Sequence, residues 1–102
     1  EYISLPHRKR VPVQYPDGGD PFVSSRIQDF FGMEKVPEIG GAPLSIHLLA
    51  PSNRPLQVTR DLKGFWVRLY PEVRRELMRL YPKHKWPENP LQPDGTKGTG
   101  IK

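Results

Sequence analysis

Prolines and glycines occur along the whole sequence and restrict it to short helices and short strands. The 102 residues include 13 prolines and 9 glycines, and hydrophobic residues make up only 35%. Proline lacks the backbone N–H that a helix or a strand ladder uses, and glycine weakens both kinds of element. We therefore expect many turns and loops around one modest core, in a chain long enough for a single domain.

Alternating apolar residues predict two β-hairpins. In residues 2–15 the alternation runs on both sides of the charged break His7–Arg10, which is expected at the hairpin tip. Solubility explains these charges better than a contact with phosphate. The alternation returns in residues 44–49 and 56–59, which are separated by turn residues. We expect the two hairpins to form one small antiparallel sheet.

Three segments have the apolar spacing of short helices. The first covers residues 21–31, where Asp20 can cap the free N–H groups at the start of the helix. The second covers residues 62–69 and the third residues 71–81. They are separate because Pro71 strains the interior of a helix but suits its first turn. The predicted fold is α+β: a small antiparallel β-sheet from two hairpins packed with three short helices.

The chain is predicted to form one domain over residues 1–90 and a disordered tail over residues 91–102, which are polar and aperiodic. Because it begins with glutamate rather than methionine, we expect an excised domain of a larger protein. No secretory signal and no membrane span are visible in the sequence. The absence of cysteine excludes a disulfide framework and is compatible with a cytoplasmic location.

The sequence contains no catalytic or metal-binding motif that we recognise. It has no phosphate-binding loop of the GxxxxGK[ST] form, and no HExxH, paired CxxC or GxSxG motif. His7, His47 and His84 lie far apart in the sequence without the spacing of metal ligands. We therefore expect neither catalysis nor a bound cofactor in this chain by itself.

Positive charge is concentrated toward the C-terminus. Between Arg60 and Glu88 there are eight basic and four acidic residues, so this segment carries +4 of the net charge of +5. Basic side chains can contact phosphates, and an exposed aromatic ring can stack on an unpaired base. The candidate nucleic-acid-binding residues are Arg74, Arg75, Arg79, Lys83, Lys85 and Trp86. Alternatively, the arginines only solvate a helix, and Trp86 is buried in the core as Trp66 is expected to be.

A series of short motifs runs in order along most of the chain. They include Val11-Pro12-Val13-Gln14-Tyr15, Gln28-Asp29-Phe30-Phe31-Gly32, Val58-Thr59-Arg60-Asp61-Leu62, Gly64-Phe65-Trp66 and Tyr81-Pro82-Lys83-His84-Lys85-Trp86-Pro87-Glu88-Asn89-Pro90. In this order they resemble the C-terminal region of the HrpB-type bacterial ATP-dependent RNA helicases, of the DEAH-box class. The resemblance implies a parent enzyme with two RecA-like motor domains, which uses ATP and magnesium to move along RNA or remodel it.

The resemblance leaves two roles open for a non-catalytic accessory domain of this kind. It could assist nucleic-acid engagement by contacting single-stranded RNA through a basic helix and loop. It could instead be a structural or protein-interaction module that docks on the helicase core of the same polypeptide or on a partner, without nucleic-acid contact. As an isolated domain it is expected to be a monomer.

Overall fold

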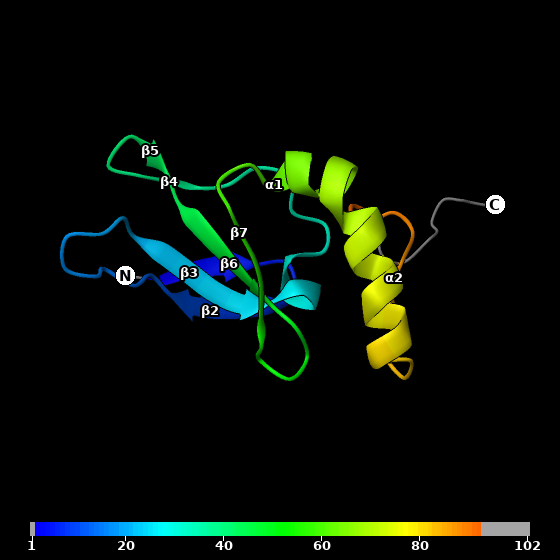
Figure 1. Cartoon of the computed structure of the whole chain (residues 1–102). Helices are drawn as coiled ribbons and strands as arrows, with labels where there is room; N and C mark the ends of the chain where they lie inside the picture. Colours follow the sequence, from blue (N-terminus) through cyan, green and yellow to red (C-terminus); the bar gives the residue numbers. More distant parts are fainter. Residues whose placement is uncertain (1, 93–102) are drawn as a thin grey trace.

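The computed structural model describes residues 2–92, and its strands form three small sheets beside one helical column (Figure 1). The first sheet is the antiparallel pair β1 (Tyr2–Leu5) and β2 (Arg8–Pro12). This pair confirms the first predicted hairpin. The turn is formed by Pro6 and His7, so the three basic residues that follow belong to β2 itself.

The second sheet has three strands in the order β3 (Phe22–Arg26), β6 (Ser45–Leu49) and β7 (Pro55–Thr59). The antiparallel pairing of β6 with β7 confirms the second predicted hairpin. The other neighbour of β6 is β3, which runs parallel to it. The prediction of one antiparallel sheet from the two hairpins is therefore wrong. A lone hairpin is marginally stable, and β6 gains its third strand from β3 rather than from the first hairpin.

The third sheet is a two-residue ladder between β4 (Glu38–Ile39) and β5 (Ala42–Pro43). Gly40 and Gly41 connect these strands with φ of 63° and 85°. Side chains other than glycine rarely adopt this left-handed conformation, so the tight turn depends on both glycines.

The predicted helix over residues 21–31 is wrong: this segment forms β3 and the 3₁₀ helix η1 (Ile27–Phe30). Val23 and Ser25 are buried and alternate with less buried neighbours, which is the pattern of a strand. Five residues of β3 pair with β6, and these long-range bonds outweigh the local helical spacing. Asp20 caps no helix here but forms an ion pair with Arg60.

The two predicted C-terminal helices form one continuous helical column. It consists of α1 (Leu62–Gly64), the π-helix η2 (Phe65–Leu69) and α2 (Tyr70–Leu80). The N–H of Tyr70 donates to the carbonyl of Phe65, five residues earlier, so the turn before Pro71 is wider than in an α-helix. Pro71 then lies in the first turn of α2, where its missing N–H is harmless. The α+β class is confirmed, although the helices differ from the prediction.

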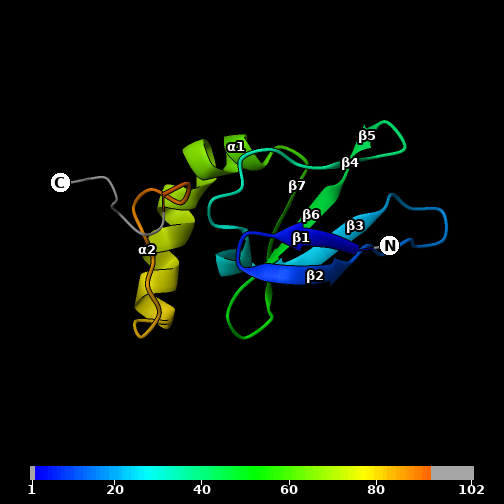
Figure 2. The same cartoon turned by 180° about the vertical axis from the view of Figure 1, so that it is seen from behind.

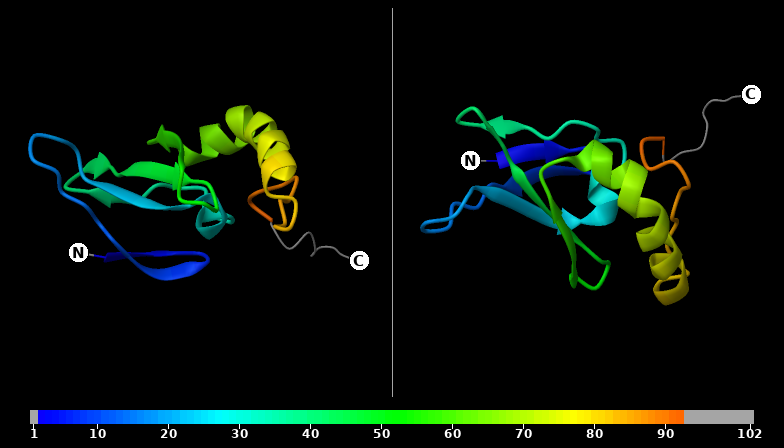
Figure 3. Two further views of the ribbon diagram at one scale, coloured as in Figure 1. Left: turned by 60° about the horizontal axis from the view of Figure 1, so that its bottom comes forward. Right: turned by 45° about the horizontal axis from the view of Figure 1, so that its top comes forward.

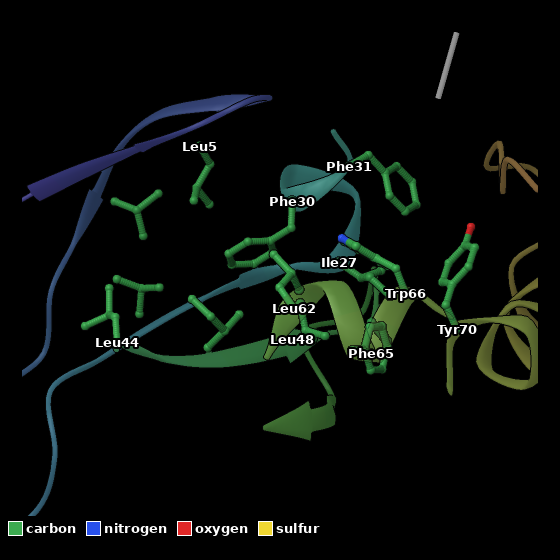
Figure 4. Packing of buried hydrophobic residues seen from close by; sticks show 14 of the residues in the cluster. Leu5, Ile27, Phe30, Phe31, Leu44, Leu48, Leu62, Phe65, Trp66 and Tyr70 are labelled. Carbon is green, nitrogen blue, oxygen red and sulfur yellow. The ribbon is translucent and has the colours of Figure 1, made fainter. Parts of the chain in front are cut away.

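The molecule has two β layers, with α2 at one end of them (Figures 2 and 3). The hydrophobic core fills the space between the hairpin and the three-stranded sheet, where Leu5, Phe30, Leu48 and Leu62 converge (Figure 4). A cluster of aromatic rings continues the core toward α2. Its members are Phe31, Phe65, Trp66, Tyr70 and Trp86, with ring centroids 5.3 to 6.5 Å apart in the contacting pairs.

The segment after α2 turns back along the helix and is tied to it by three hydrogen bonds. Trp86 donates its Nε1–H to the carbonyl of Tyr81 at 2.9 Å, and Arg74 Nε donates to the Trp86 carbonyl at 2.7 Å. The Tyr70 hydroxyl donates to the Pro87 carbonyl at 2.7 Å. These bonds fix the backbone of the loop against one side of α2.

The end of the described chain also contacts the core. Leu91 is partly buried against it, and its N–H donates to Asn89 Oδ1 at 3.0 Å. The predicted tail was to begin at this residue. Its greater part, residues 93–102, lies outside the described residues.

The Tyr70 hydroxyl gives the domain an alkaline pH dependence. Burial raises the pKa of Tyr70 from the ordinary 10.0 to about 12, although the Arg74 charge acts in the opposite direction. Above pH 10 the unfolded state loses its Tyr70 proton before the folded state does. The contribution of Tyr70 to stability is therefore complete below pH 10 and is lost as the pH rises to about 12.

We expect Tyr70→Phe to reduce this alkaline loss of stability, because phenylalanine does not ionise. At neutral pH the variant should be less stable by about 1 kcal/mol, since the Pro87 carbonyl loses its donor. Urea unfolding at a series of pH values measures both effects. Identical pH profiles of the two proteins would show that Tyr70 doesn't titrate in this way.

Candidate nucleic-acid interface

Two of the candidate arginines lie on the solvent side of α2. Arg75 and Arg79 are four residues apart, which places them on the same face of an α-helix, and both are exposed. Glu76 accepts a hydrogen bond from Arg79 at 2.5 Å, whereas Arg75 forms no ion pair within residues 2–92. The Glu76–Arg79 pair is on the surface and contributes little stability, so Arg79 can exchange it for a phosphate.

Lys83 and Lys85 extend this positive surface past the end of α2. Both are exposed, and neither forms an ion pair in the described part of the chain. Their backbone is held by the anchored Trp86, so the lysines remain close to the last turn of the helix. A cation near the C-terminal end of a helix also interacts favourably with its dipole. We call Arg75, Arg79, Lys83 and Lys85 the basic helix surface.

The other two candidates have a different environment. Trp86 is only 6% exposed, and its ring packs edge-on against Phe31 at 6.5 Å. Arg74 is half-buried and holds the Trp86 carbonyl. Both therefore hold the loop against α2. For Trp86 this agrees with the alternative from the sequence, in which Trp86 is buried in the core. In this arrangement no face of the Trp86 ring is available to stack on a base.

Two of the three histidines contact other side chains. His47 stacks on Phe22 with ring centroids 4.1 Å apart, and burial lowers the pKa of His47 below its ordinary value. His84 lies beside the basic helix surface, with Nδ1 3.3 Å from Nε2 of Gln28. Residues 2–92 contain no group of three or more histidine, aspartate or glutamate side chains that could hold a metal ion.

A second polar site was missed by the sequence analysis. It is a cavity of about 390 Å³, here called the arginine pocket, near the ends of β3 and β6 and the turn between β6 and β7. Its lining residues are Arg8, Ser24, Ser25, Arg26, Asp29, Leu49 and Asn53. The sequence predicted Arg8 at an exposed hairpin tip and residues 24–29 in a helix. The alternation of Val23 and Ser25 could have indicated a strand, but no local pattern places Ser25 beside Arg8.

The sequence matches a known family over most of its length. The family model described as ATP-dependent helicase C-terminal matches residues 1–90. The chain is 39% identical over 100 residues to the ATP-dependent RNA helicase HrpB of Escherichia coli strain K12. This match covers 96% of the chain but only 12% of the length of that relative.

Two solved structures are also similar to the chain. The crystal structure of the E. coli DExH-box NTPase HrpB matches with a TM-score of 0.82 at 40% identity, covering 88% of this chain and 11% of that one. The crystal structure of Escherichia coli DEAH/RHA helicase HrpB matches with a TM-score of 0.58 at 40% identity, covering 83% and 11%. Within residues 2–92, every helix is too short or too polar to span a bilayer.

Proposed function

The chain belongs to the HrpB-type ATP-dependent helicase C-terminal family, and from this premise we propose that it assists nucleic-acid engagement by contacting single-stranded RNA through the basic helix surface. The chain spans about an eighth of the length of its curated relative, or 12%. The helicase activity of a parent protein, its use of ATP and magnesium and its cytoplasmic location are parts of the same proposal. ATP and magnesium would bind to motor domains outside this chain.

The observation that carries the proposal is the exposure of four cations at one end of the helical column. Only Arg79 among them has an acidic partner within residues 2–92. Unpaired lysines and arginines near one another favour contact with a polyanion, whose bound counterions they release. With Trp86 buried, the contact we propose is with phosphates rather than with bases, so it should depend little on RNA sequence.

The expected binding is weak, salt-dependent and specific to this surface. If each of the four cations contacts one phosphate, raising the salt from roughly 50 to 200 mM should weaken RNA binding roughly 50-fold. In Arg75→Ala/Arg79→Ala/Lys83→Ala, one contact remains, and the same change of salt should weaken binding only about threefold. Fluorescence anisotropy of a labelled single-stranded RNA measures both proteins.

A matched control removes the same charge elsewhere. Lys35, Arg60 and Lys63 are exposed and lie around a different depression of the surface. Lys35→Ala/Arg60→Ala/Lys63→Ala should keep most of the affinity and nearly the whole salt dependence. Equal losses in the two triple variants would mean that net charge alone attracts RNA. No binding at tens of micromolar protein would contradict the proposal for the isolated domain.

A second candidate function is docking on the helicase core of the same polypeptide, and exposed apolar side chains favour it. Val67 is 66% exposed on the helical column, and Val58 is 56% exposed on β7. Leu69, Met78 and Leu80 are exposed on the column as well. Because most of the relative's length lies outside the matched region, a large surface of the parent is available to cover them.

The docking function predicts a difference between the isolated domain and the full-length protein. Val67→Ser/Leu69→Ser should change the stability of the isolated domain by no more than about 0.5 kcal/mol per substitution, since both side chains are exposed. In the full-length helicase the same variant should be cut by protease near this domain faster than the wild type. Equal cleavage rates would contradict docking through this face.

A further inference from the structure

We infer that the arginine pocket is a binding site for a phosphate group, separate from the basic helix surface. The pocket combines two arginines with hydroxyl and amide donors from three parts of the chain: Arg8 from β2, residues 24–29 from β3 and η1, and Asn53 from the β6–β7 turn. This inference does not depend on the proposed contact of α2 with RNA, because the residues of the two sites do not overlap.

One of the two guanidinium groups is held in place by a buried hydroxyl. Ser25 is 1% exposed, and its Oγ accepts a hydrogen bond from Arg8 Nη1 at 2.8 Å. The same hydroxyl donates to Asp29 Oδ2 at 2.5 Å, which fixes its hydrogen and leaves its lone pairs for Arg8. A guanidinium has five N–H donors, and Ser25 occupies one of them. Arg8 is therefore oriented before any ligand arrives, which lowers the entropic cost of binding.

The fold explains why these residues meet. The hydrogen bonds between Gln14 and Phe22 place the segment after β2 alongside the start of β3, so the start of β2 lies near the end of β3. Arg8 and Ser25 are 17 residues apart in sequence and come together through this antiparallel arrangement. Asn53, with φ of 70°, belongs to the turn between β6 and β7 and lines the pocket as well.

The charges at the pocket favour an anion. Arg8 and Arg26 are positive and Asp29 is negative, so the lining carries a net +1. Neither arginine forms an ion pair within residues 2–92, although four other basic side chains there do. Asp29 is engaged by Ser25, and one carboxylate is too few for a divalent cation, which takes several oxygen ligands.

A phosphate group suits these donors better than a simple halide would. Guanidinium forks bind two phosphate oxygens at once, and the Ser24 hydroxyl and the Asn53 amide can donate to the remaining ones. A cavity of about 390 Å³ lies within the range of about 300–1,000 Å³ that is usual for small-ligand sites. The group could be part of an RNA backbone or belong to free phosphate, and the two sources share this chemistry.

The test is an amide NMR titration of the whole chain with inorganic phosphate, with sodium chloride and with sodium acetate at matched ionic strength. Phosphate should shift the signals of Ser24, Ser25, Arg26 and Asn53, and the other two salts should not. Arg8→Gln and Arg26→Gln should each weaken phosphate binding by at least about tenfold. Lys9→Gln removes an exposed charge from the neighbouring position of β2 and should leave the affinity unchanged.

Arg26→Gln separates an effect on binding from an effect on folding. Arg26 makes no side-chain hydrogen bond to the buried Ser25, so its substitution should not disturb the Ser25–Asp29 pair, whereas Arg8→Gln removes a hydrogen bond to Ser25. Pocket shifts caused equally by chloride or acetate would overturn the inference, and so would an absence of shifts with phosphate. A short RNA without terminal phosphates identifies the source. Shifts of the same signals indicate backbone phosphate, whereas shifts with inorganic phosphate alone indicate a free ligand.

A variant of the basic helix surface tests whether the two sites are independent. Arg75→Ala/Arg79→Ala/Lys83→Ala should bind phosphate in the arginine pocket as the wild type does, whatever its affinity for RNA. Loss of the pocket shifts in that variant would overturn the claim that the two sites are separate.

Discussion

Replacing Trp86 with alanine is expected to destabilise the domain by about 3–5 kcal/mol, the usual cost of truncating a buried tryptophan. The Trp86 side chain is 6% exposed and packs on Phe31, and it donates a hydrogen bond to the Tyr81 carbonyl. The loss would be a large part of the roughly 5–15 kcal/mol by which small domains are usually stable. Urea unfolding followed by far-UV circular dichroism measures it.

Two further variants separate the causes of this loss. Trp86→Phe keeps an aromatic ring but removes the N–H, so it should cost much less than Trp86→Ala, by about the 1 kcal/mol of one hydrogen bond plus the smaller ring. Tyr2→Ala removes an aromatic side chain that is 55% exposed and contacts Arg10, and should have little effect. A Trp86→Ala protein as stable as Tyr2→Ala would contradict the role of Trp86 as an anchor.

The Trp86 anchor also links stability to the proposed function. Lys83 and Lys85 belong to the loop that Trp86 holds against α2. Once this loop is released, the two lysines lose their fixed position near Arg79. We therefore expect Trp86→Ala to weaken RNA binding even under conditions in which the protein remains folded.

The second large effect is expected for Phe30→Ala, again about 3–5 kcal/mol. Phe30 is fully buried at the end of η1, and its ring points into the space between the two β layers (Figure 4). Removing it leaves a cavity between the two layers, and the loss includes the contacts that the ring makes there. The measurement is the same denaturant unfolding.

Phe22→Ala is the matched control for Phe30→Ala. Phe22 lies in β3 and is only partly buried, with one face of its ring stacked on His47. Its truncation should cost clearly less than that of Phe30, because solvent can fill the space that the ring leaves. Equal losses for the two variants would show that Phe30 is not the central residue of the core that its burial indicates.

The family was recognisable from motifs, and much of the local structure was recognisable from spacing. The β1–β2 and β6–β7 hairpins follow from alternation across polar breaks, a signal that depends on neighbouring residues alone. The helical character of residues 62–80 also followed from spacing, but its continuity across Pro71 did not. The π-helix before the proline, in which the Tyr70 N–H donates to the Phe65 carbonyl, is not visible in the spacing of apolar residues.

The sequence named the candidate residues but not their surroundings. Arg75, Arg79, Lys83 and Lys85 are exposed, as binding would require, and their role as a site stays a prediction. Whether Trp86 faces solvent or the core was left open by the sequence. It was decided by the rings of the aromatic cluster and by a carbonyl at the end of α2, which together offer this side chain a buried place.

The sequence by itself determined the two hairpins, the helical character of residues 62–80, the charge of the C-terminal segment and the family. Only the tertiary structure decided that residues 22–26 form a strand. The buried residues of this region fit the spacing of either element, because Val23 and Ile27 are four residues apart, as on one face of a helix, and Val23 and Ser25 are two apart, as on one face of a strand. Pairing with β6 satisfies the backbone of β3 across the sheet, and a helix here would have left β6 without that neighbour. The arginine pocket depends on the long-range approach of β2 to β3, which brings Arg8 to Ser25, and for that reason no local pattern could reveal it.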